Sequence, residues 1–294
     1  MLAECHAHIM LDGENIKTAK ARHAANINIR YIENVFSEYK KRSIHFIRDG
    51  GDNAGVSEAA KELARKYGID YATPVFAIHK KGLYGSIVGK SFDDFAEYKI
   101  LVSEAVSRGA DFIKIMATGI LDFDIYGKVS EGYIPYEQLS DLISFAHDND
   151  LSVMVHVNGA ERIMDCAKAG ADSIEHGFYQ NDESICAMKE FGSVWVPTLV
   201  AAKNLTKIKN RDNAVLEKIV LEHEKNIIKA FHNGNFVASG SDAGAYNVRH
   251  AEGTIEEYNA LIRIFEDKAS INTRIAESVK VIKKKFLKRK YQHE

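Results

Sequence analysis

Short apolar runs alternate with amphipathic helical stretches along most of the chain. Several of these runs contain hardly any polar residue, which is typical of parallel strands that helices cover on both faces. Glycine often stands between a helical stretch and the next apolar run, where it can end a helix. The pattern predicts eight strands, at residues 2–8, 43–48, 71–78, 111–117, 151–156, 173–176, 193–199 and 236–241.

Eight strand–helix units over about 250 residues have the size of a (β/α)8 TIM barrel, so we expect an α/β fold of this kind. A doubly wound sheet is the main alternative, but no glycine-rich phosphate turn follows the first strand. No linker or break in composition divides the chain, so we expect residues 1–294 to form a single domain. Residues 270–294 should be a basic C-terminal helical tail, whose lysines are most simply a solvated helix face.

The composition favours a soluble cytoplasmic protein, and we expect its partner to be a small-molecule substrate. Lys plus Arg (39) nearly balance Asp plus Glu (41), so no strong field suggests nucleic acid or a membrane surface as partner. The three cysteines are odd in number and far apart, which argues against a disulfide framework. We find neither an apolar run long enough to span a membrane nor a signal-peptide pattern. Homo-oligomerisation is left open.

Two histidines, His6 and His8, close the first apolar run. Side chains two residues apart point to the same face of a strand, so these imidazoles converge on one spot. Convergent imidazoles suit a divalent metal ion. Two histidines in this spacing, taken alone, are more often a coincidence on the surface. The prediction therefore depends on the positions of the other potential metal ligands.

Further polar side chains end or interrupt the predicted strands. In a TIM barrel the carboxyl ends of all strands face one mouth, where active sites lie. The residues expected to meet there are His6, His8, Lys114, His156, His176 and Asp242. Taken singly, a strand histidine is more often a hydrogen-bonded core residue, and Asp242 is equally well explained as a turn or cap residue.

Lys114 interrupts the apolar run 112–116 and is the hardest of these residues to explain structurally. An unpaired buried ammonium is very costly, and burial lowers the pKa of a lysine, which favours the neutral amine. Such an amine can react with carbon dioxide to give a carbamate with two anionic oxygens. Those oxygens could bridge two divalent metal ions about 3.5–4 Å apart.

These segments resemble the amidohydrolase superfamily, and the likeness is strongest to prolidase-like and imidazolonepropionase-like enzymes with a carboxylated lysine. The resemblance extends over residues 1–265, in segments 4–8, 109–119, 155–159, 169–177, 196–199 and 240–244 and, loosely, 35–51. The ligand set that it implies is His6, His8, Lys114 and Asp242 for one metal, and Lys114, His156 and His176 for the other. Enzymes of this branch usually carry a flanking β-sandwich domain, which we expect to be lacking here because the chain begins at the first strand.

We therefore expect metal-assisted hydrolysis of a C–N bond, in a peptide-like or cyclic amide. Two metal ions would lower the pKa of a shared water, and Asp242 would pass the proton of the nucleophile to the leaving nitrogen. Zinc is the first choice, with manganese and iron as alternatives. Two other functions stay open, a lactonase or phosphotriesterase that uses the same site and a metal-binding barrel without turnover.

Five loop residues are candidates for substrate binding. Arg249 and His250 follow the last predicted strand and could bind a substrate carboxylate, although simple surface exposure explains them equally well. Three others lie after the third and fourth predicted strands and could hold the carbonyl oxygen; they are His79, Tyr126 and Tyr133. The loop 120–126 has less glycine than relatives tend to have, which leaves the substrate open.

Overall fold

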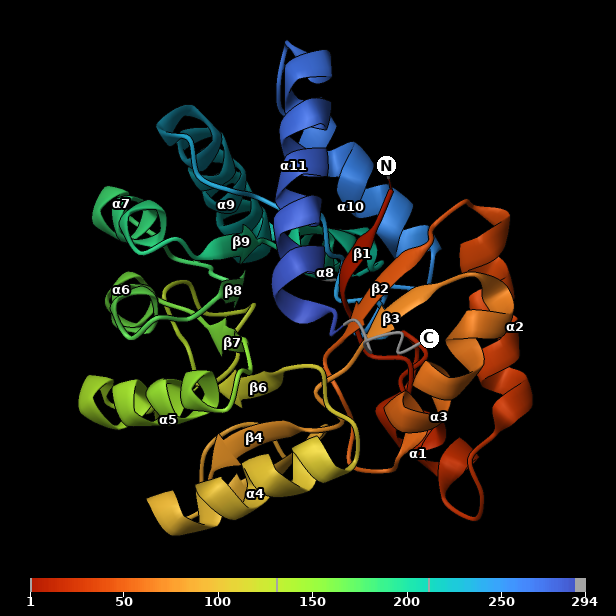
Figure 1. Cartoon of the computed structure of the whole chain (residues 1–294). Coiled ribbons are helices and arrows are strands. Elements are labelled where there is room, and N and C mark those ends of the chain that lie inside the picture. The colour runs from red at the N-terminus through yellow and green to blue at the C-terminus, as the bar shows by residue number, and fades with distance from the viewer. Residues whose placement is uncertain (1, 131, 211, 289–294) are drawn as a thin grey trace.

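The apolar runs fold into short, buried parallel strands with helices around them (Figure 1). The computed structural model describes residues 2–130, 132–210 and 212–288. The strands are β1 (Glu4–Ala7), β2 (Phe46–Asp49), β3 (Asp70–Ala72), β4 (Ala77–Lys80), β5 (Gly89–Phe92), β6 (Ile113–Met116), β7 (Val153–Val157), β8 (Ser173–His176) and β9 (Val194–Val196). The helices are α1 (Ile16–His23), α2 (Ile29–Lys41), α3 (Val56–Ala64), α4 (Phe95–Ser107), α5 (Tyr136–Asp148), α6 (Ala160–Lys168), α7 (Asp182–Glu190), α8 (Leu199–Lys203), α9 (Ala214–Asn233), α10 (Glu252–Arg263) and α11 (Lys268–Phe286), with 3-10 turns η1 (Arg65–Tyr67) and η2 (Asn204–Lys207).

Two parallel sheets make up the barrel wall, in the orders β1-β2-β3 and β5-β4-β6-β7-β8-β9. The segment after α9 joins β9 to β1. The Trp195 N–H donates to the carbonyl of Phe236 (2.9 Å), and the Cys5 N–H donates to the carbonyl of Ser239 (3.1 Å). The fold is therefore the predicted (β/α)8 barrel. Within the described residues every strand belongs to these two sheets, so this part of the chain holds no β-sandwich.

The third predicted strand, residues 71–78, is wrong as a single strand. β3 pairs with β2, whereas β4 pairs with β6. Pro74 lacks the N–H that a strand ladder needs, and Val75 has a left-handed backbone (φ 69°), so the chain turns between the two pieces. The last predicted strand is reduced to isolated bridges, such as the one between Val237 and Trp195.

The helices cover the outside of the barrel with one apolar face each. In α2 the buried residues are Ile32, Val35, Phe36 and Tyr39, a spacing that puts all four on one side of the helix. The same reasoning predicted helices throughout the chain. In this arrangement the polar face of each helix lies in solvent. The carboxyl ends of the strands are not covered by helices and form the mouth of the barrel.

The C-terminal helix α11 lies across the amino ends of the strands. Two of its lysines form ion pairs there, Lys283 with Asp70 (2.7 Å) and Lys285 with Asp172 (2.8 Å). These two lysines are therefore partly engaged with the barrel, although the prediction treated them as a solvated face. The last residues of the basic tail, 289–294, lie outside the described residues.

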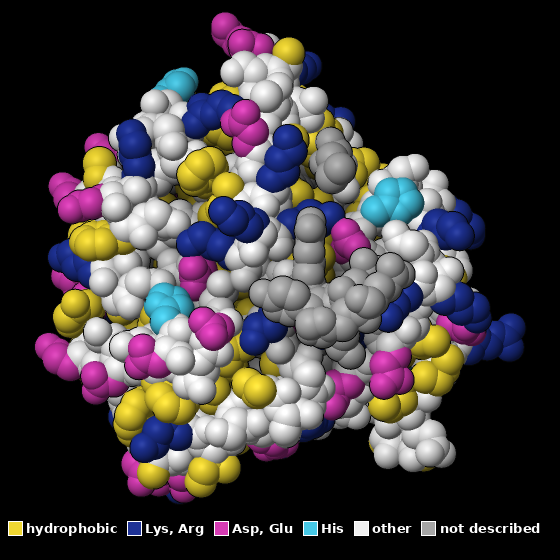
Figure 2. Space-filling model, viewed as in Figure 1, with side chains coloured by type: hydrophobic (Ala, Val, Ile, Leu, Met, Phe, Trp, Pro, Cys, Tyr) yellow, Lys and Arg dark blue, Asp and Glu magenta, His cyan; other side chains and the backbone are white. Residues whose placement is uncertain are grey.

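The molecular face that carries α11 shows basic and acidic side chains interspersed (Figure 2). This mixture agrees with the nearly balanced charge of the sequence. In the part of the chain that the structure describes, no helix has the length and apolar character needed to cross a membrane.

Candidate metal centre

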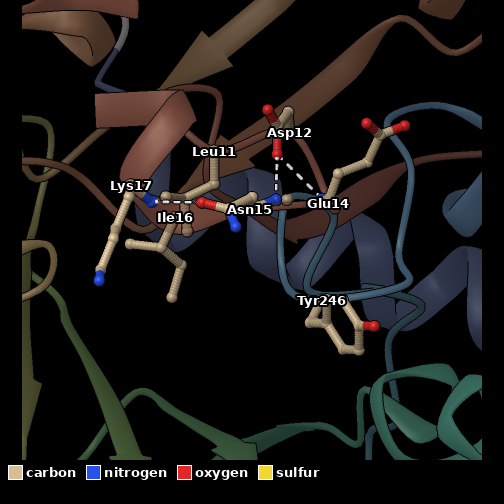
Figure 3. A pocket seen from close by; sticks show the side chains of 8 residues that line it. Leu11, Asp12, Glu14, Asn15, Ile16, Lys17 and Tyr246 are labelled. Carbon is tan, nitrogen blue, oxygen red and sulfur yellow. Dashed lines mark hydrogen bonds between the residues drawn. The ribbon is translucent and has the colours of Figure 1, made fainter. Parts of the chain in front are cut away.

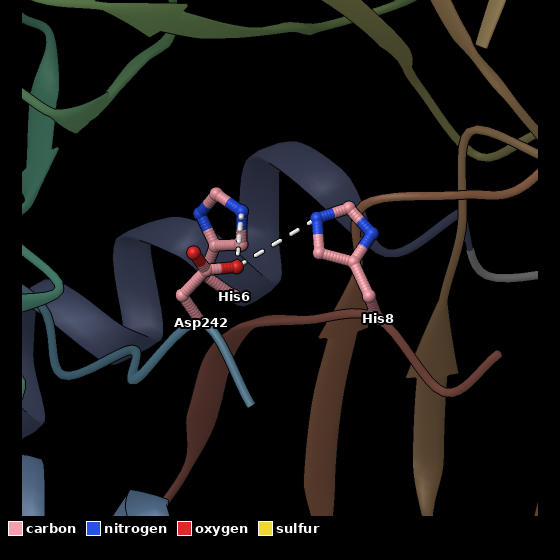
Figure 4. Close-up of side chains that lie close together, drawn as sticks. All are labelled: His6, His8 and Asp242. Carbon is pink, nitrogen blue, oxygen red and sulfur yellow. Dashed lines mark ion pairs between the residues drawn. The ribbon is translucent and has the colours of Figure 1, made fainter. Parts of the chain in front are cut away.

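His6, His8 and Asp242 converge at the carboxyl ends of the barrel strands (Figure 4). The Nε2 atoms of His6 and His8 lie 3.6 and 3.7 Å from Oδ1 of Asp242. One ligand atom from each of the three residues falls within 4.8 Å of the others. Nitrogen and carboxylate donors at this spacing can surround one divalent ion.

Lys114 lies in β6 with its amine against this cluster. Its Nζ is 3.0 Å from Nε2 of His6, and the residue is only 1% exposed. Burial lowers the pKa of Lys114 to about 8, while the negative charges of Glu175 and Asp242 act in the opposite direction. The neutral amine is thus accessible close to neutral pH.

His156 and His176 complete the cluster on the far side of His6. Their ring centroids are 4.6 Å apart, and the rings of His6 and His176 are 4.9 Å apart. His156 donates from Nε2 to the carbonyl of Gly119 (3.0 Å), and Nδ1 of His176 lies 2.8 Å from Oγ1 of Thr198. Each ring therefore keeps its other nitrogen for a ligand.

Burial keeps these histidines in the form that binds metals. It lowers the pKa of His8 to about 3 and that of His156 to about 4. The pKa values of His6 and His176 are also well below the usual range, because the rings are desolvated and lie close to other cationic groups. Neutral imidazoles next to the partly buried carboxylate of Asp242 are a donor set that fits zinc and similar divalent ions.

Strained backbone marks the same place. His176 (φ 65°), Thr198 (φ 48°) and Asp242 (φ 60°) are non-glycine residues in the left-handed region. Such conformations cost about 1–3 kcal/mol each and persist only where the surroundings hold them. Their concentration around the ligand cluster is typical of a functional site.

A buried carboxylate orients His6. Glu175 accepts a hydrogen bond from Nδ1 of His6 (2.7 Å), which leaves Nε2 of that ring for a metal. Arg48 donates to both oxygens of Glu175 (2.8 and 2.9 Å) and so compensates its charge. The sequence analysis missed both residues. The signal was available, because charged residues inside fully buried strands need partners, as Lys114 does.

A second buried carboxylate ties the first strand to the turn of Asp242. Glu4 accepts the backbone N–H of His6 (3.0 Å) and that of Ser241 (2.8 Å). It also accepts the hydroxyl groups of Ser241 and of Thr254 in α10. Two ligands that lie 236 positions apart in the chain are thus held in fixed register by one side chain.

Asp49 at the end of β2 holds the loop that supports His8. It accepts the N–H groups of Ile9 (2.8 Å) and Gly51 (2.6 Å), and the Gly51 carbonyl accepts Nδ1–H of His8 (3.2 Å). Gly50 must lack a side chain, because a Cβ there would lie 2.3 Å from Cε1 of His8.

The sequence model of the amidohydrolase family matches residues 31–281. The chain belongs to the amidohydrolase family. Its sequence is 26% identical to the ochratoxinase of Aspergillus niger in an alignment of 274 positions that covers 82% of this chain and 57% of that protein. The chain therefore spans little more than half the length of this curated relative.

Solved structures agree with this membership at the level of the fold. A Xaa-Pro dipeptidase with methionine bound in its active site superposes with a TM-score of 0.75 at 22% identity, over 97% of this chain and 75% of that one. The A. niger ochratoxinase superposes with a TM-score of 0.77 at 20% identity, over 95% and 71% of the two chains.

In this amidohydrolase three predicted substrate residues are engaged elsewhere, and one of them, His79, lies in strand β4 and not in a loop. His79 is buried and its Nδ1 donates to the carbonyl of Lys80 (3.0 Å). Tyr126 is 39% exposed and its hydroxyl donates to Glu222 of α9, whereas Tyr133 is 49% exposed and its ring lies under Arg162. In residues 2–130, 132–210 and 212–288, none of these three makes a hydrogen bond or ring contact with a candidate ligand.

The two residues predicted after the last strand also have partners. Arg249 forms an ion pair with Glu14 (3.3 Å) at the surface. His250 lies with Nε2 2.8 Å from the Leu11 carbonyl and Nδ1 3.3 Å from the hydroxyl of Tyr39. Its ring nitrogens are therefore occupied by the fold.

Tyr84 is an unpredicted tyrosine of this amidohydrolase that faces the centre. It lies in the loop between β4 and β5, with its ring centroid 5.3 Å from that of His156. Within the part of the chain that is described, its hydroxyl has no hydrogen-bond partner. Burial, followed by the charge of Asp242, raises the pKa of Tyr84 to about 12, so the hydroxyl stays a donor. No periodic pattern in that loop could have identified it.

A cavity of about 400 Å³ lies beside the loop that follows β1 (Figure 3). Its lining residues are Leu11, Asp12, Glu14, Asn15, Ile16, Lys17, Gly244 and Tyr246. Gly244 follows Asp242 by two residues, but none of the candidate ligands lines this cavity.

Proposed function

We propose that the chain is a metal-dependent amidohydrolase that cleaves a C–N bond in a peptide-like or cyclic amide. The observation that carries the proposal is the convergence of His6, His8 and Asp242, with the Lys114 amine beside them, at the barrel mouth. Family membership supports it. The name of one structural neighbour, a Xaa-Pro dipeptidase, makes dipeptides the first substrate class to test.

Two divalent ions, zinc in the first instance, would be held in this centre. The residues proposed for one ion are His6, His8, Lys114 and Asp242, and those for the other are Lys114, His156 and His176. Bound there, the pair would supply Lewis acidity and a water of lowered pKa. We propose that the neutral amine of Lys114 would add to carbon dioxide and lose a proton, which would provide two carbamate oxygens as metal ligands.

Asp242 is the proposed proton carrier. Burial raises its pKa to about 6, with Lys114 acting to lower it, so the carboxylate can accept a proton near neutral pH. It would take the proton from the attacking water and deliver it to the leaving nitrogen. Its left-handed backbone, held by Glu4 through Ser241, keeps the carboxylate directed at His6 and His8.

The test is hydrolysis by the zinc-loaded chain. Xaa-Pro dipeptides, N-acyl amino acids and cyclic amides form one panel, and lactones and phosphotriesters form the other. We expect turnover within the amide panel, lost on chelation and in Asp242→Asn. Turnover of the ester panel alone would contradict the amidase assignment. Full zinc content without any turnover would contradict the enzymatic function itself.

A further inference from the structure

His176 is oriented by a residue in an unusual conformation. Nδ1 of His176 lies 2.8 Å from Oγ1 of Thr198, which follows β9 and precedes α8. The backbone of Thr198 is left-handed, with φ 48° and ψ 42°. A β-branched residue rarely adopts this conformation, and it persists only where neighbouring groups hold it.

Thr198 does not use its hydroxyl in the manner usual for its position. A threonine before a helix normally caps it by accepting a backbone N–H, but Thr198 makes no such bond. Glu257 of α10 caps α8 instead, accepting the N–H groups of Leu199 (3.0 Å) and Val200 (2.8 Å). The Thr198 hydroxyl is therefore free to face His176.

The residue before Thr198 is held as well. Nε2–H of His223, in α9, donates to the carbonyl of Pro197 (2.9 Å). Thr198 and Glu257 are both fully buried, so water does not compete for these bonds. Side chains from two different helices thus fix the turn on both sides of Thr198.

We propose that Thr198 and Glu257 are positioning residues for His176. The Thr198 hydroxyl accepts a hydrogen bond from Nδ1–H of His176, which leaves the Nε2 lone pair of that ring for a metal. Glu257 holds Thr198 in the backbone conformation that presents this hydroxyl. The inference rests on the proposed function, in which His176 binds one of the two ions. Orienting bonds of this kind typically change metal affinity about 10–100-fold.

The experiment follows the transfer of zinc from the loaded full-length chain to a competing chelator. Thr198→Val keeps the β-branched shape but removes the hydroxyl. We expect it to weaken one of the two zinc ions by about 10–100-fold and to leave the other unchanged. Thr198→Ser restores the hydroxyl and should bring the affinity back to within about threefold of the original. Zinc retained by Thr198→Val as tightly as by the unchanged chain would overturn the proposal.

A double variant tests the role of Glu257. Glu257→Gln should weaken the same zinc ion, and it should have no further effect when Thr198→Val is already present, because Glu257 acts through Thr198. Additive losses of zinc affinity would contradict that link. Asp94→Asn is the matched control, since Asp94 caps α4 by accepting the Glu97 N–H (2.9 Å). It should lower stability without changing zinc affinity. If Glu257→Gln does not fold, the two Thr198 variants still decide the role of the hydroxyl.

The proposal and the proposed function can fail separately, because the zinc measurement needs no substrate. Two bound zinc ions without amide hydrolysis would contradict the proposed function alone. If the chain hydrolyses amides and Thr198→Val leaves the zinc affinity unchanged, only the positioning role would be contradicted. A chain that binds no zinc would contradict both.

Discussion

Lys114 shows how far a single residue can lead from sequence to chemistry. A lysine inside an apolar strand needs a reason, and the structure places its amine 3.0 Å from a histidine of the candidate centre. Glu175 and Arg48 are also charged residues inside buried strands and therefore need partners. Applying this rule to every charged strand residue would have identified them. Thr198 could not be found in this way, because backbone strain leaves no mark in the residue pattern.

Changing Lys114 to Ala should remove most of the activity and one of the two metal ions. The loss should exceed the roughly 100-fold that displacement of an orienting group causes, because a bridging ligand disappears. Metal analysis and turnover of the purified variant check this expectation. Partial rescue by short carboxylic acids would support the carbamate, whereas two retained metals with full turnover would refute the bridging role.

The ring of Tyr84 lies beside His156 and its hydroxyl has no hydrogen-bond partner among the described residues, so we expect this hydroxyl to donate to a substrate oxygen. Tyr84→Phe should lower kcat by about 100–1000-fold, as the loss of one oxyanion donor does, and leave zinc content unchanged. Tyr126→Phe is the matched control, because that hydroxyl is bound to Glu222. A loss in the control and none in Tyr84→Phe would reverse the two assignments.

At the scale of elements, periodicity located most strands and helices, and the ends of the predicted strands then indicated the candidate ligands. It failed at residues 73–76, where Pro74 and the left-handed Val75 divide one predicted strand between two sheets. The periodicity of apolar residues also gave no information on the loop that contains Tyr84. Loops are shaped by tertiary contacts that no alternation of residue types encodes.

Helix α9 carries a buried histidine that should make stability depend on pH. Burial lowers the pKa of His223 to about 4 from a usual value of 6.5. The folded chain therefore prefers the neutral ring, so this contribution is complete above pH 6.5 and is lost as the pH falls towards 4. His223→Gln should reduce the difference in unfolding free energy between pH 7 and pH 5 by about 2 kcal/mol. Urea unfolding at the two pH values measures it, and an unchanged difference would exclude this role.

At the scale of the whole molecule, the amino-terminal end of the barrel, which α11 covers, is linked to the candidate metal centre. Phe286 of α11 packs edge-on against Phe112 and lies 4.4 Å from the Arg48 guanidinium, which in turn holds Glu175 and through it His6. The barrel was predictable because strand–helix units repeat along the sequence. This link was not, because it joins a residue near the C-terminus to the first strand.

Phe286→Ala should lower the unfolding free energy by about 3–5 kcal/mol, because a large buried side chain leaves a cavity. It should also weaken zinc binding, since Arg48 loses the ring that supports it. Urea unfolding and chelator competition measure the two effects. The expected loss of stability in Phe286→Ala with unchanged zinc affinity would show that the amino-terminal end of the barrel and the candidate metal centre are independent.

The central claim is that six side chains from distant strands bind a pair of metal ions at the mouth of this barrel. Anomalous diffraction at the zinc edge, from crystals of the zinc-loaded chain, tests it most directly. The account predicts two peaks enclosed by His6, His8, Lys114, His156, His176 and Asp242. Zinc peaks elsewhere, or none among these residues, would contradict it.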